Sequence, residues 1–488
     1  MSVEKTLLEM VEIKPSLLRK ISVDPPVYIF SDRQIGKLLP IKGIHVYGPY
    51  DYQTTSEHLK RSFKGVEIFV LYPNGENNVK DALIQLISFV GNGYSQTNGY
   101  DTNFDGFRNE FRLERLSLPE IDEFVKYEVG NLSSTLNELK SEFSEALRRE
   151  NVPLVIIGGT SHRSFLERRN QYVEAKRCTT SIGIPVQYAS YYEVKDGGYG
   201  ILYQISKGLE GLGYSLWNFS LNLYGKVGGI PWIVRQGMDS NIVDISIGLR
   251  FAKTSKGYVV GHAVILDSFG RLIGTLTSSS FRISGMKVPR NLIREFLSAI
   301  LEKALKDPRI VKIYENGKKV LNIALHRLNF FHPEEIEGVK EAIEKTKIVH
   351  QLEEIKLGLV SVIDKPTFTL FNDSAESKSA IVGTGLIINE KTAVVCTAGS
   401  LRAEDKRHLI YPVIVSCQNL GNENSLFDKI EDVCKHVVDL AALHWQTVVP
   451  ASIRLPATLE FAQNVARLYV YGVQPPSNSW LERTLWFI

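Results

Sequence analysis

The sequence predicts an α/β protein of two successive units, a doubly wound parallel sheet followed by a mixed sheet covered by helices. Apolar runs alternate with helical patterns over residues 66–226, and strand patterns then follow one another directly after 228–232. The chain has 488 residues, of which 44% are hydrophobic and 23% charged, so it can build large cores. This composition excludes disordered, collagen-like and fibrous chains.

The first unit follows a mixed segment, residues 1–40, that is too short for a domain and contains the apolar run 27–30. The stretch 42–51, KGIHVYGPYD, is dense in Gly and Pro and predicts an opening turn. Strands are expected where apolar residues run together, and helices where they recur every three or four positions. These patterns give strands at 66–72, 153–159 and 184–189, and helices at 78–90, 119–149, 162–178 and 201–226.

The second unit opens with three strand candidates at 242–252, 258–267 and 271–281. Ser268-Phe269-Gly270 joins the last two as a hairpin turn. A helix, a strand and a helix then follow, which is the order of an RNase H-like layer. The predicted positions are 290–306, 321–327 and 333–346, with further strands and with helices at 426–446 and 458–470. We therefore predict an N-terminal segment at 1–40 and domains at 41–233 and 234–488.

Charge and cysteine usage limit the class of protein. Lys+Arg total 57 and Asp+Glu 54, a formal charge of +3, which excludes a uniformly basic coat but leaves room for a local basic pocket. The four cysteines form no CxxC pair, so neither a sequence-local zinc site nor a disulfide framework is expected. The N-terminus lacks the apolar core of a signal peptide, and no apolar run is long enough to span a bilayer. A cytoplasmic protein without membrane insertion is predicted.

The strongest local motif is Asn218–Trp232, NFSLNLYGKVGGIPW. Asn222 and Lys226 are four residues apart and share one helix face, which runs into a Gly-Gly turn. Taken alone, the motif also fits a helix C-terminus capped by glycines. The segment resembles the hallmark of Argonaute proteins, in which a lysine-bearing helix precedes Gly-Gly at the boundary between the MID and PIWI domains.

Upstream residues extend this resemblance to a pocket. Tyr172 and Lys176 share a helix face, and Gln187 follows on the next strand candidate. The resemblance implies that Tyr172, Lys176, Gln187 and Lys226 bind the 5′-phosphate of a guide strand. The chemistry agrees, because a terminal phosphate carries nearly two charges and many acceptor sites. Residues 161–235 hold nine Lys/Arg and five Asp/Glu, a net charge of +4 against +3 for the whole chain.

The resemblance also implies a metal ion beside this pocket. Some prokaryotic relatives place a polar amide four residues before the lysine, where it binds a divalent ion together with the C-terminal carboxylate. Asn222 occupies that position here, and the sequence ends in the apolar tail Trp486-Phe487-Ile488. Oxygen ligands suit Mg²⁺, so Asn222 and Ile488 are the expected metal ligands. Core packing is the alternative role for the tail.

The stretch 42–51 resembles the segment that opens the MID domain in archaeal members of the family. The roughly forty residues before it leave no room for the N and PAZ domains of long Argonautes. The resemblance therefore implies a short prokaryotic Argonaute of archaeal type, with a Rossmann-like MID domain and an RNase H-like PIWI domain.

A nuclease centre of the RNase H type needs a group of carboxylates that holds two metal ions. Asp244 is expected at the first position of the Argonaute tetrad. Leu328 stands at the third position, in ALHRLN, and Gln463 at the fourth, in LPATLEFAQNVA. The glutamate has no clear candidate, and Glu295, within a predicted helix, is a poor one. With two ligands lost, cleavage is predicted to be absent.

The leading hypothesis is a module that binds a 5′-phosphorylated guide RNA or DNA and pairs it with a complementary target, with DNA favoured. Arg327 is expected on the nucleic-acid backbone. The resemblance implies a sensor in prokaryotic defence that acts through effector and APAZ-like partner proteins. One alternative is an active guide-dependent nuclease with a rearranged metal cluster drawn from Asp244, Asp267 and Glu334 or Glu335. The other is a protein-interaction scaffold with a decayed nucleic-acid site.

Overall fold

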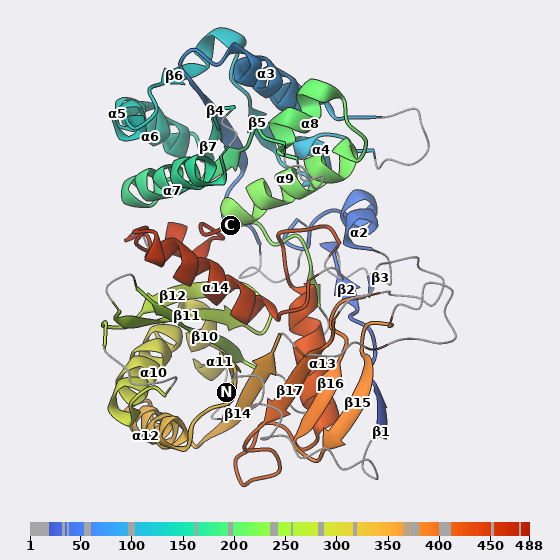
Figure 1. Cartoon of the computed structure of the whole chain (residues 1–488), viewed down its shortest axis with the longest axis vertical. Coiled ribbons are helices and arrows are strands. Elements are labelled where there is room, and N and C mark those ends of the chain that lie inside the picture. The colour runs from blue at the N-terminus through green and yellow to red at the C-terminus, as the bar shows by residue number, and fades with distance from the viewer. Residues whose placement is uncertain are drawn as a thin grey trace. The chain divides into compact units, whose positions relative to one another are not determined.

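The protein folds into two compact units (Figure 1). The structure is a computed structural model that describes residues 19–31, 35–36, 39–52, 60–95, 103–161, 164–193, 199–234, 243–254, 257–281, 287–315, 320–364, 366, 370, 380–399, 411–449, 453–477 and 480–488. The parallel-sheet unit comprises Tyr28–Ile233, Trp445–Val449 and Leu468–Ile488. The mixed-sheet unit comprises Met1–Val27, Val234–His444 and Pro450–Arg467. The predicted segment 1–40 is thus divided between the units, and the end of the chain folds with the parallel-sheet unit.

The parallel-sheet unit is built on strands that all pair in parallel. The central strands read as almost continuous apolar runs, as strands covered on both faces must. The order is β5 (Arg115–Ser117), β4 (Gly65–Pro73), β7 (Asn151–Gly158) and β8 (Val186–Ala189), and β6 (Val125–Tyr127) also pairs with β4. A short second sheet has the order β3 (Ile35–Gly36), β2 (Tyr28–Ile29) and β9 (Ile233–Val234).

Helices cover both faces of the parallel sheet, which confirms the doubly wound architecture (Figure 1). One face carries α3 (Asn77–Asn92), α8 (Ile201–Lys207) and α9 (Leu212–Lys226). The other carries α5 (Leu132–Glu138), α6 (Lys140–Arg148) and α7 (Phe165–Ile182), whose apolar sides bury against β7 and β8.

Three sequence predictions for this unit are wrong in detail. The stretch 119–149 is not one helix, because Gly130 (φ 87°) and the strand-forming run at β6 interrupt it after the short η4 (Ile121–Glu123). The helix predicted at 201–226 is split by Gly208 (φ 59°) and Gly211 (φ 78°), which adopt left-handed backbone angles. The predicted opening turn is largely helix α2 (Pro40–Tyr47), which begins with a proline as first turns allow.

Asp51 ties the opening segment of this unit to the Asn218–Trp232 motif. Its carboxylate accepts hydrogen bonds from the Tyr224 hydroxyl and, at 2.9 Å, from the Ile230 backbone N–H. Asp51 is 1% exposed. Gly229 lets the chain pass close to this point, because a Cβ atom there would lie 2.4 Å from the Tyr224 ring. The two segments that carry the family resemblance therefore share one buried hydrogen-bond centre.

The mixed-sheet unit has a nine-stranded sheet. Its three central strands are parallel, and the outer pairs are antiparallel. The order is β1 (Arg19–Ser22), β15 (Thr384–Asn389), β16 (Thr392–Val395), β17 (Val413–Cys417), β14 (Glu354–Ile363), β13 (Val320–Leu328), β10 (Ile245–Lys253), β11 (Val259–Asp267) and β12 (Leu272–Thr277). The sequence predicted the β10–β12 meander but not β1, which pairs through Arg19 and Ile387 with a strand far along the chain.

Helices also cover both faces of the mixed sheet. One face buries α10 (Arg290–Leu305) and α12 (Pro333–Val349), and α11 (Pro308–Glu315) packs on α10. The other buries α13 (Ile430–Ala442) and the start of α14 (Ala457–Val470). α14 approaches β10 closely, because a Cβ atom on Gly248 would lie 2.2 Å from the Thr458 carbonyl oxygen. This contact places the start of α14 against the middle of β10.

Two further observations bear on the class of protein. Within the described ranges, no helix combines the length and apolar character that a membrane span requires. Cys178, Cys396, Cys417 and Cys434 are buried and form no disulfide.

Asp51 gives a pH-dependent test of this core. Burial raises its pKa from 3.8 to about 6, and the bonds from Tyr224 and Ile230 only partly oppose that rise. A carboxyl with a raised folded pKa contributes stability that is complete below its unfolded pKa and is lost as the pH rises through its folded pKa. The free energy of unfolding of the wild type, relative to Asp51→Asn, should therefore fall by up to about 3 kcal/mol between about pH 4 and 7. Urea titrations across this range measure it, and a constant difference would contradict the assignment.

Candidate nucleic-acid interface

The parallel-sheet unit buries two lysines side by side. Lys176 lies in the middle of α7, and Lys226 is the last residue of α9. Each is 1% exposed, which is rare for lysine. The C-terminal position of Lys226 is favourable, because the carbonyl end of a helix carries partial negative charge.

Both amines donate to oxygens of the main chain or of an amide side chain. The Lys176 Nζ donates to the main-chain oxygen of Trp486 at 2.7 Å and to that of Ile488. The Lys226 Nζ donates to the Gln187 side-chain oxygen. In the part of the chain that the structure describes, no carboxylate side chain pairs with either lysine. Within that part, the two buried amines therefore lie without a carboxylate side chain that would stabilise their protonated forms.

The pKa values of both lysines are lowered, as expected for buried amines without a carboxylate side chain beside them. Burial lowers the pKa of Lys176 from 10.5 to about 7. Burial also lowers the pKa of Lys226 well below its ordinary value, and the charge of Lys176 lowers it further. An anion that enters the pocket would reverse both shifts, because it stabilises the protonated amines.

The end of the chain is held against the helices that carry the lysines. The Leu485 N–H donates to the Gly225 carbonyl at 3.3 Å. A Cβ atom on Gly225 would approach the Leu485 side chain to 2.8 Å, so glycine permits this contact. On α7, Arg177 donates to the Tyr471 carbonyl at 3.0 Å. These contacts bring the Ile488 main-chain oxygen to Lys176.

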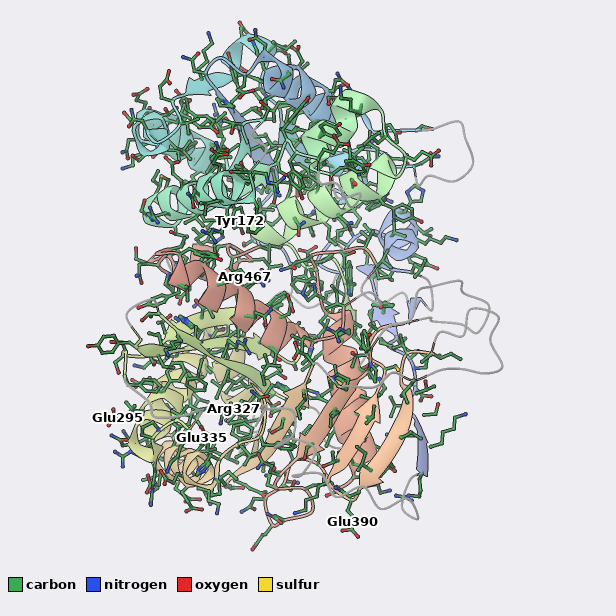
Figure 2. All side chains as sticks on the ribbon, viewed as in Figure 1. Tyr172, Glu295, Arg327, Glu335, Glu390 and Arg467 are labelled. Atoms are coloured by element: carbon green, nitrogen blue, oxygen red, sulfur yellow. The ribbon has the colours of Figure 1, made fainter. Side chains whose placement is uncertain are left out.

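The other predicted pocket residues lie on the same elements. Tyr172 lies on α7 (Figure 2), one turn before Lys176. The Lys176 Nζ is 5.5 Å from the centroid of its ring. Its ring also meets Tyr188 edge-on, with centroids 6.0 Å apart. Asn222 stands one turn before Lys226. Its Oδ1 atom is buried and has no hydrogen-bond partner among the described residues, so an acceptor is left for a ligand.

One part of this site was not predicted. Gln171 accepts hydrogen bonds from the Thr160 N–H at 3.1 Å and from the Tyr188 hydroxyl at 2.9 Å. It thereby fixes the loop after β7 and the strand that carries Gln187. Gly159 makes room, because a Cβ atom there would lie 2.1 Å from the Tyr188 hydroxyl. The glycine pair that ends β7 was the available signal, since glycines after a strand mark close approach.

The strand register corrects the predicted nuclease positions in the mixed-sheet unit. Leu249 of β10 pairs with Arg327 of β13, so Leu328 lies beside Arg250. Asp244 lies six residues earlier on the chain, about 20 Å along the strand. Asp244 and Leu328 therefore do not share a site, and Arg250 occupies the position expected for the first carboxylate.

Asp244 has a structural role in this arrangement. Its Oδ2 atom accepts a hydrogen bond from the Asn322 backbone N–H at 2.8 Å, at the start of the parallel strands. Glu295, the poor candidate for the glutamate, is exposed on α10 (Figure 2).

Gln463 lies on a charged face of α14. Glu460, Gln463 and Arg467 are spaced three and four residues apart and share one helix face. The charges of Arg467 and Glu460 act on Arg250, so this face is turned toward the end of β10. Arg327, by contrast, is 8% exposed and pairs with the fully buried Glu335 (Figure 2). It is committed to that ion pair and does not offer its charge to a nucleic-acid backbone as predicted.

The rearranged metal cluster of the nuclease hypothesis does not form. Asp267 pairs with Arg271 at 2.6 Å, and Glu334 pairs with Lys287. Glu335 is taken by Arg327 and by the Val288 N–H at 2.8 Å. Together with Asp244, these carboxylates are held apart by separate structural contacts. They form no group with metal-ligand spacing, although all lie in the described ranges.

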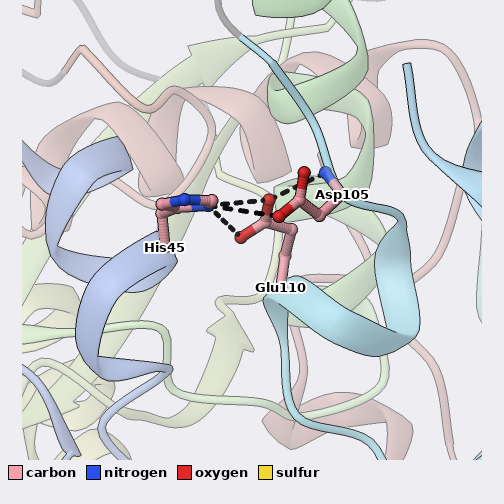
Figure 3. A group of neighbouring side chains, drawn as sticks. All are labelled: His45, Asp105 and Glu110. Atoms are coloured by element: carbon pink, nitrogen blue, oxygen red, sulfur yellow. Dashed lines mark hydrogen bonds and ion pairs between the residues drawn. The ribbon is translucent and has the colours of Figure 1, made fainter. Parts of the chain in front are cut away.

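The described residues do contain one group with such spacing: His45, Asp105 and Glu110 (Figure 3). The Glu110 carboxylate is 1% exposed and accepts hydrogen bonds from His45 Nδ1 at 3.1 Å and from the Asp105 N–H at 2.9 Å. Burial raises the pKa of Glu110, and these bonds lower it. The group ties α2 to the loop before α4 (Phe107–Glu110) and needs no ion to be satisfied.

Comparison with known proteins shows which sequences and structures this chain resembles. No protein-family model matches the sequence. The Protein argonaute of Cereibacter sphaeroides (strain ATCC 17025 / ATH 2.4.3) is 21% identical over 478 residues, covering 92% of this chain and 56% of that protein.

Solved Argonaute structures share the fold of both units. Clostridium butyricum Argonaute bound to a guide DNA (5′ deoxycytidine) and a 19-mer target DNA matches with a TM-score of 0.64, at 20% identity over 94% of this chain and 54% of that one. Marinitoga piezophila Argonaute in complex with 5′ OH guide RNA matches with a TM-score of 0.58, at 12% identity over 95% and 59%. The chain thus spans a little over half the length of the proteins it matches, and its α/β fold resembles that of the Argonaute MID and PIWI domains.

Proposed function

We propose that this chain binds the 5′-phosphorylated end of a guide RNA or DNA and uses the guide to recognise a complementary strand without cutting it. Base pairing would read the sequence, and the protein would hold the backbones. The observation that carries the proposal is the buried pair Lys176 and Lys226, which has no carboxylate side chain as a partner within the described ranges. A terminal phosphate supplies the missing negative charge and enough oxygens for both amines.

Each neighbour of the lysine pair suits this ligand. Gln187 and Tyr172 add a neutral amide and a phenol, which bind phosphate oxygens without adding charge. The Tyr172 ring can also stack on the first base of the strand. A 5′-hydroxyl would not stabilise the protonated amines, so the pocket favours a phosphorylated end.

A magnesium ion fits beside this pocket. Asn222 Oδ1 is a buried acceptor without a partner, and the Ile488 main-chain oxygen keeps a second lone pair after its bond from Lys176. These two oxygens would hold the ion, which prefers oxygen ligands. When bound, it would neutralise part of the guide phosphate charge.

The absence of cleavage rests on the residues at the former metal positions. Leu328 offers no ligand atom, Gln463 is neutral, and Arg250 is a cation where a carboxylate is required. Metal ions that activate water need carboxylates to hold them. Recognition without cleavage needs a separate output, and we propose that effector and APAZ-like partner proteins provide it in defence against invading nucleic acid. DNA is the favoured target, as in the Clostridium butyricum complex.

The lysine pair gives the first test. Lys176→Met with Lys226→Met keeps the aliphatic bulk and removes two charged donors, each of which contributes about 1.5–3 kcal/mol. Affinity for a short RNA with a 5′-phosphate should fall at least tenfold in a fluorescence titration, and affinity for the 5′-hydroxyl form should change little.

The matched control is Lys126→Ala with Lys140→Ala, which removes the same charge from exposed positions of the same unit. It should retain the preference for the phosphate. If the double methionine variant loses affinity equally for the 5′-phosphorylated and the 5′-hydroxyl RNA, the pocket assignment fails and the scaffold hypothesis takes its place.

Removal of the metal tests the magnesium site. With chelator in place of Mg²⁺, binding of the 5′-phosphorylated RNA should weaken several-fold, because phosphate charge is left less neutralised. In Asn222→Leu, the affinity should no longer depend on Mg²⁺. A chelator effect that persists unchanged in Asn222→Leu would place the ion elsewhere.

The proposed inactivity is tested by cleavage. The guide-loaded protein, incubated with a matched RNA or DNA target and with Mg²⁺ or Mn²⁺, should leave the target intact on a denaturing gel. Guide-dependent cleavage that disappears in Arg250→Ala, or in any carboxylate variant of this domain, would restore the nuclease hypothesis.

A further inference from the structure

We infer that Arg250 and Arg467 form a second phosphate site, which holds one phosphodiester of the target strand at the position where an active relative would hold metal ions. This inference rests on the proposed function, because the target must first pair with a bound guide. The ligand is the singly charged linkage of a paired strand rather than a terminal phosphate.

The geometry brings three elements together. Arg250 lies near the carboxyl end of β10, beside Leu328 at the end of β13. Asp364 directly follows β14, the next parallel strand. Ligand sites of parallel α/β sheets lie at the carboxyl ends of the strands. Arg467 lies on α14, whose start packs against Gly248 of β10, and its charge acts on Arg250.

The side chain of Arg250 is poorly compensated. It makes no hydrogen bond and no ion pair with any described residue, and burial lowers its pKa. The charges of Asp364 and Glu460 act on it from a distance, and that of Arg467 opposes them. The half-buried Arg454 donates to the Asp364 backbone carbonyl at 2.6 Å. The cluster therefore holds three arginines against two carboxylates, a net charge of +1.

Other arginines in the same unit have direct carboxylate partners. Arg327 is paired with Glu335, Arg271 with Asp267, and Arg309 with Asp307 at 2.7 Å. The fold thus satisfies its structural arginines with direct carboxylate partners. Arg250 and Arg467 keep their guanidinium groups available, and a guanidinium binds phosphate oxygens in a bidentate manner.

The chemistry of the site follows from the exchange of metal for arginine. Two metal ions at such a centre polarise the scissile phosphate and activate water. Guanidinium groups neutralise the same phosphate charge but do not lower the pKa of a bound water. The position where a strand would be cut thus becomes one where it is held.

The test uses guide-loaded protein and a matched DNA target in which one phosphodiester at a time is replaced by an uncharged methylphosphonate. In the wild type, neutralising one linkage, or two adjacent ones, should speed target release about tenfold. Arg250→Gln should release the unmodified target about tenfold faster, and the modified linkage should then have no further effect. Arg294→Gln, which removes an exposed arginine from α10, should behave as the wild type.

A second measurement separates binding from folding. Arg250→Met removes a half-buried cation without a partner, so its thermal midpoint should stay level or rise while target release becomes faster. The inference would be overturned if the neutralised linkage speeds target release equally in the wild type and in Arg250→Gln. It would also be overturned if Arg250→Met has a lower thermal midpoint and releases the target at an unchanged rate. Guide loading is measured in the same samples, so a failure of the guide pocket is distinguished from a failure of this second site.

Discussion

The arrangement of the parallel-sheet unit depends on two lysines that are buried with no carboxylate side chain beside them among the described residues. Lys176 and Lys226 cost the protein stability, because burial of an ammonium group is unfavourable unless it is paired. The fold meets part of this cost with oxygens from the Gln187 side chain and from the main chain at Trp486 and Ile488. Helices α7 and α9, strand β8 and the end of the chain must therefore all be in place around the pair. A carboxylate would have been a simpler partner, but it would also have filled the place of an anionic ligand.

The sequence predicted this pocket better than the nuclease position, for a physical reason. Tyr172 with Lys176, and Asn222 with Lys226, are related by one helical turn, and that periodicity is fixed once the helix is predicted. The approach of Ile488 to Lys176 is a long-range contact that no local pattern contains, so only the family resemblance suggested it. The Asn222 environment, a buried acceptor without a partner, was also beyond any local signal.

The nuclease position depends instead on how neighbouring strands are aligned. Asp244 was the acidic residue on the right strand, and nothing in the sequence fixes the register of β10 against β13. The pairing of Leu249 with Arg327 decides it and moves the site to Arg250. The same distinction holds for the fold at large. The strands with continuous apolar runs were predicted, whereas the glycine breaks at Gly208 and Gly211 and the pairing of β1 with β15 were not.

The same energetic argument applies to the lysine pair in one unit and to Arg250 in the other. Each is a basic side chain removed from water that has no carboxylate side chain as a direct partner among the described residues, whereas structural arginines such as Arg309 are paired. Uncompensated charge is retained in a protein when a ligand compensates it, because the binding free energy of that ligand then includes the relief of the unfavourable burial. A guide phosphate would favour protonation of both lysines, and a single linkage would offset the net positive charge around Arg250. Each phosphate would thus recover part of the free energy that burial of the basic side chains costs.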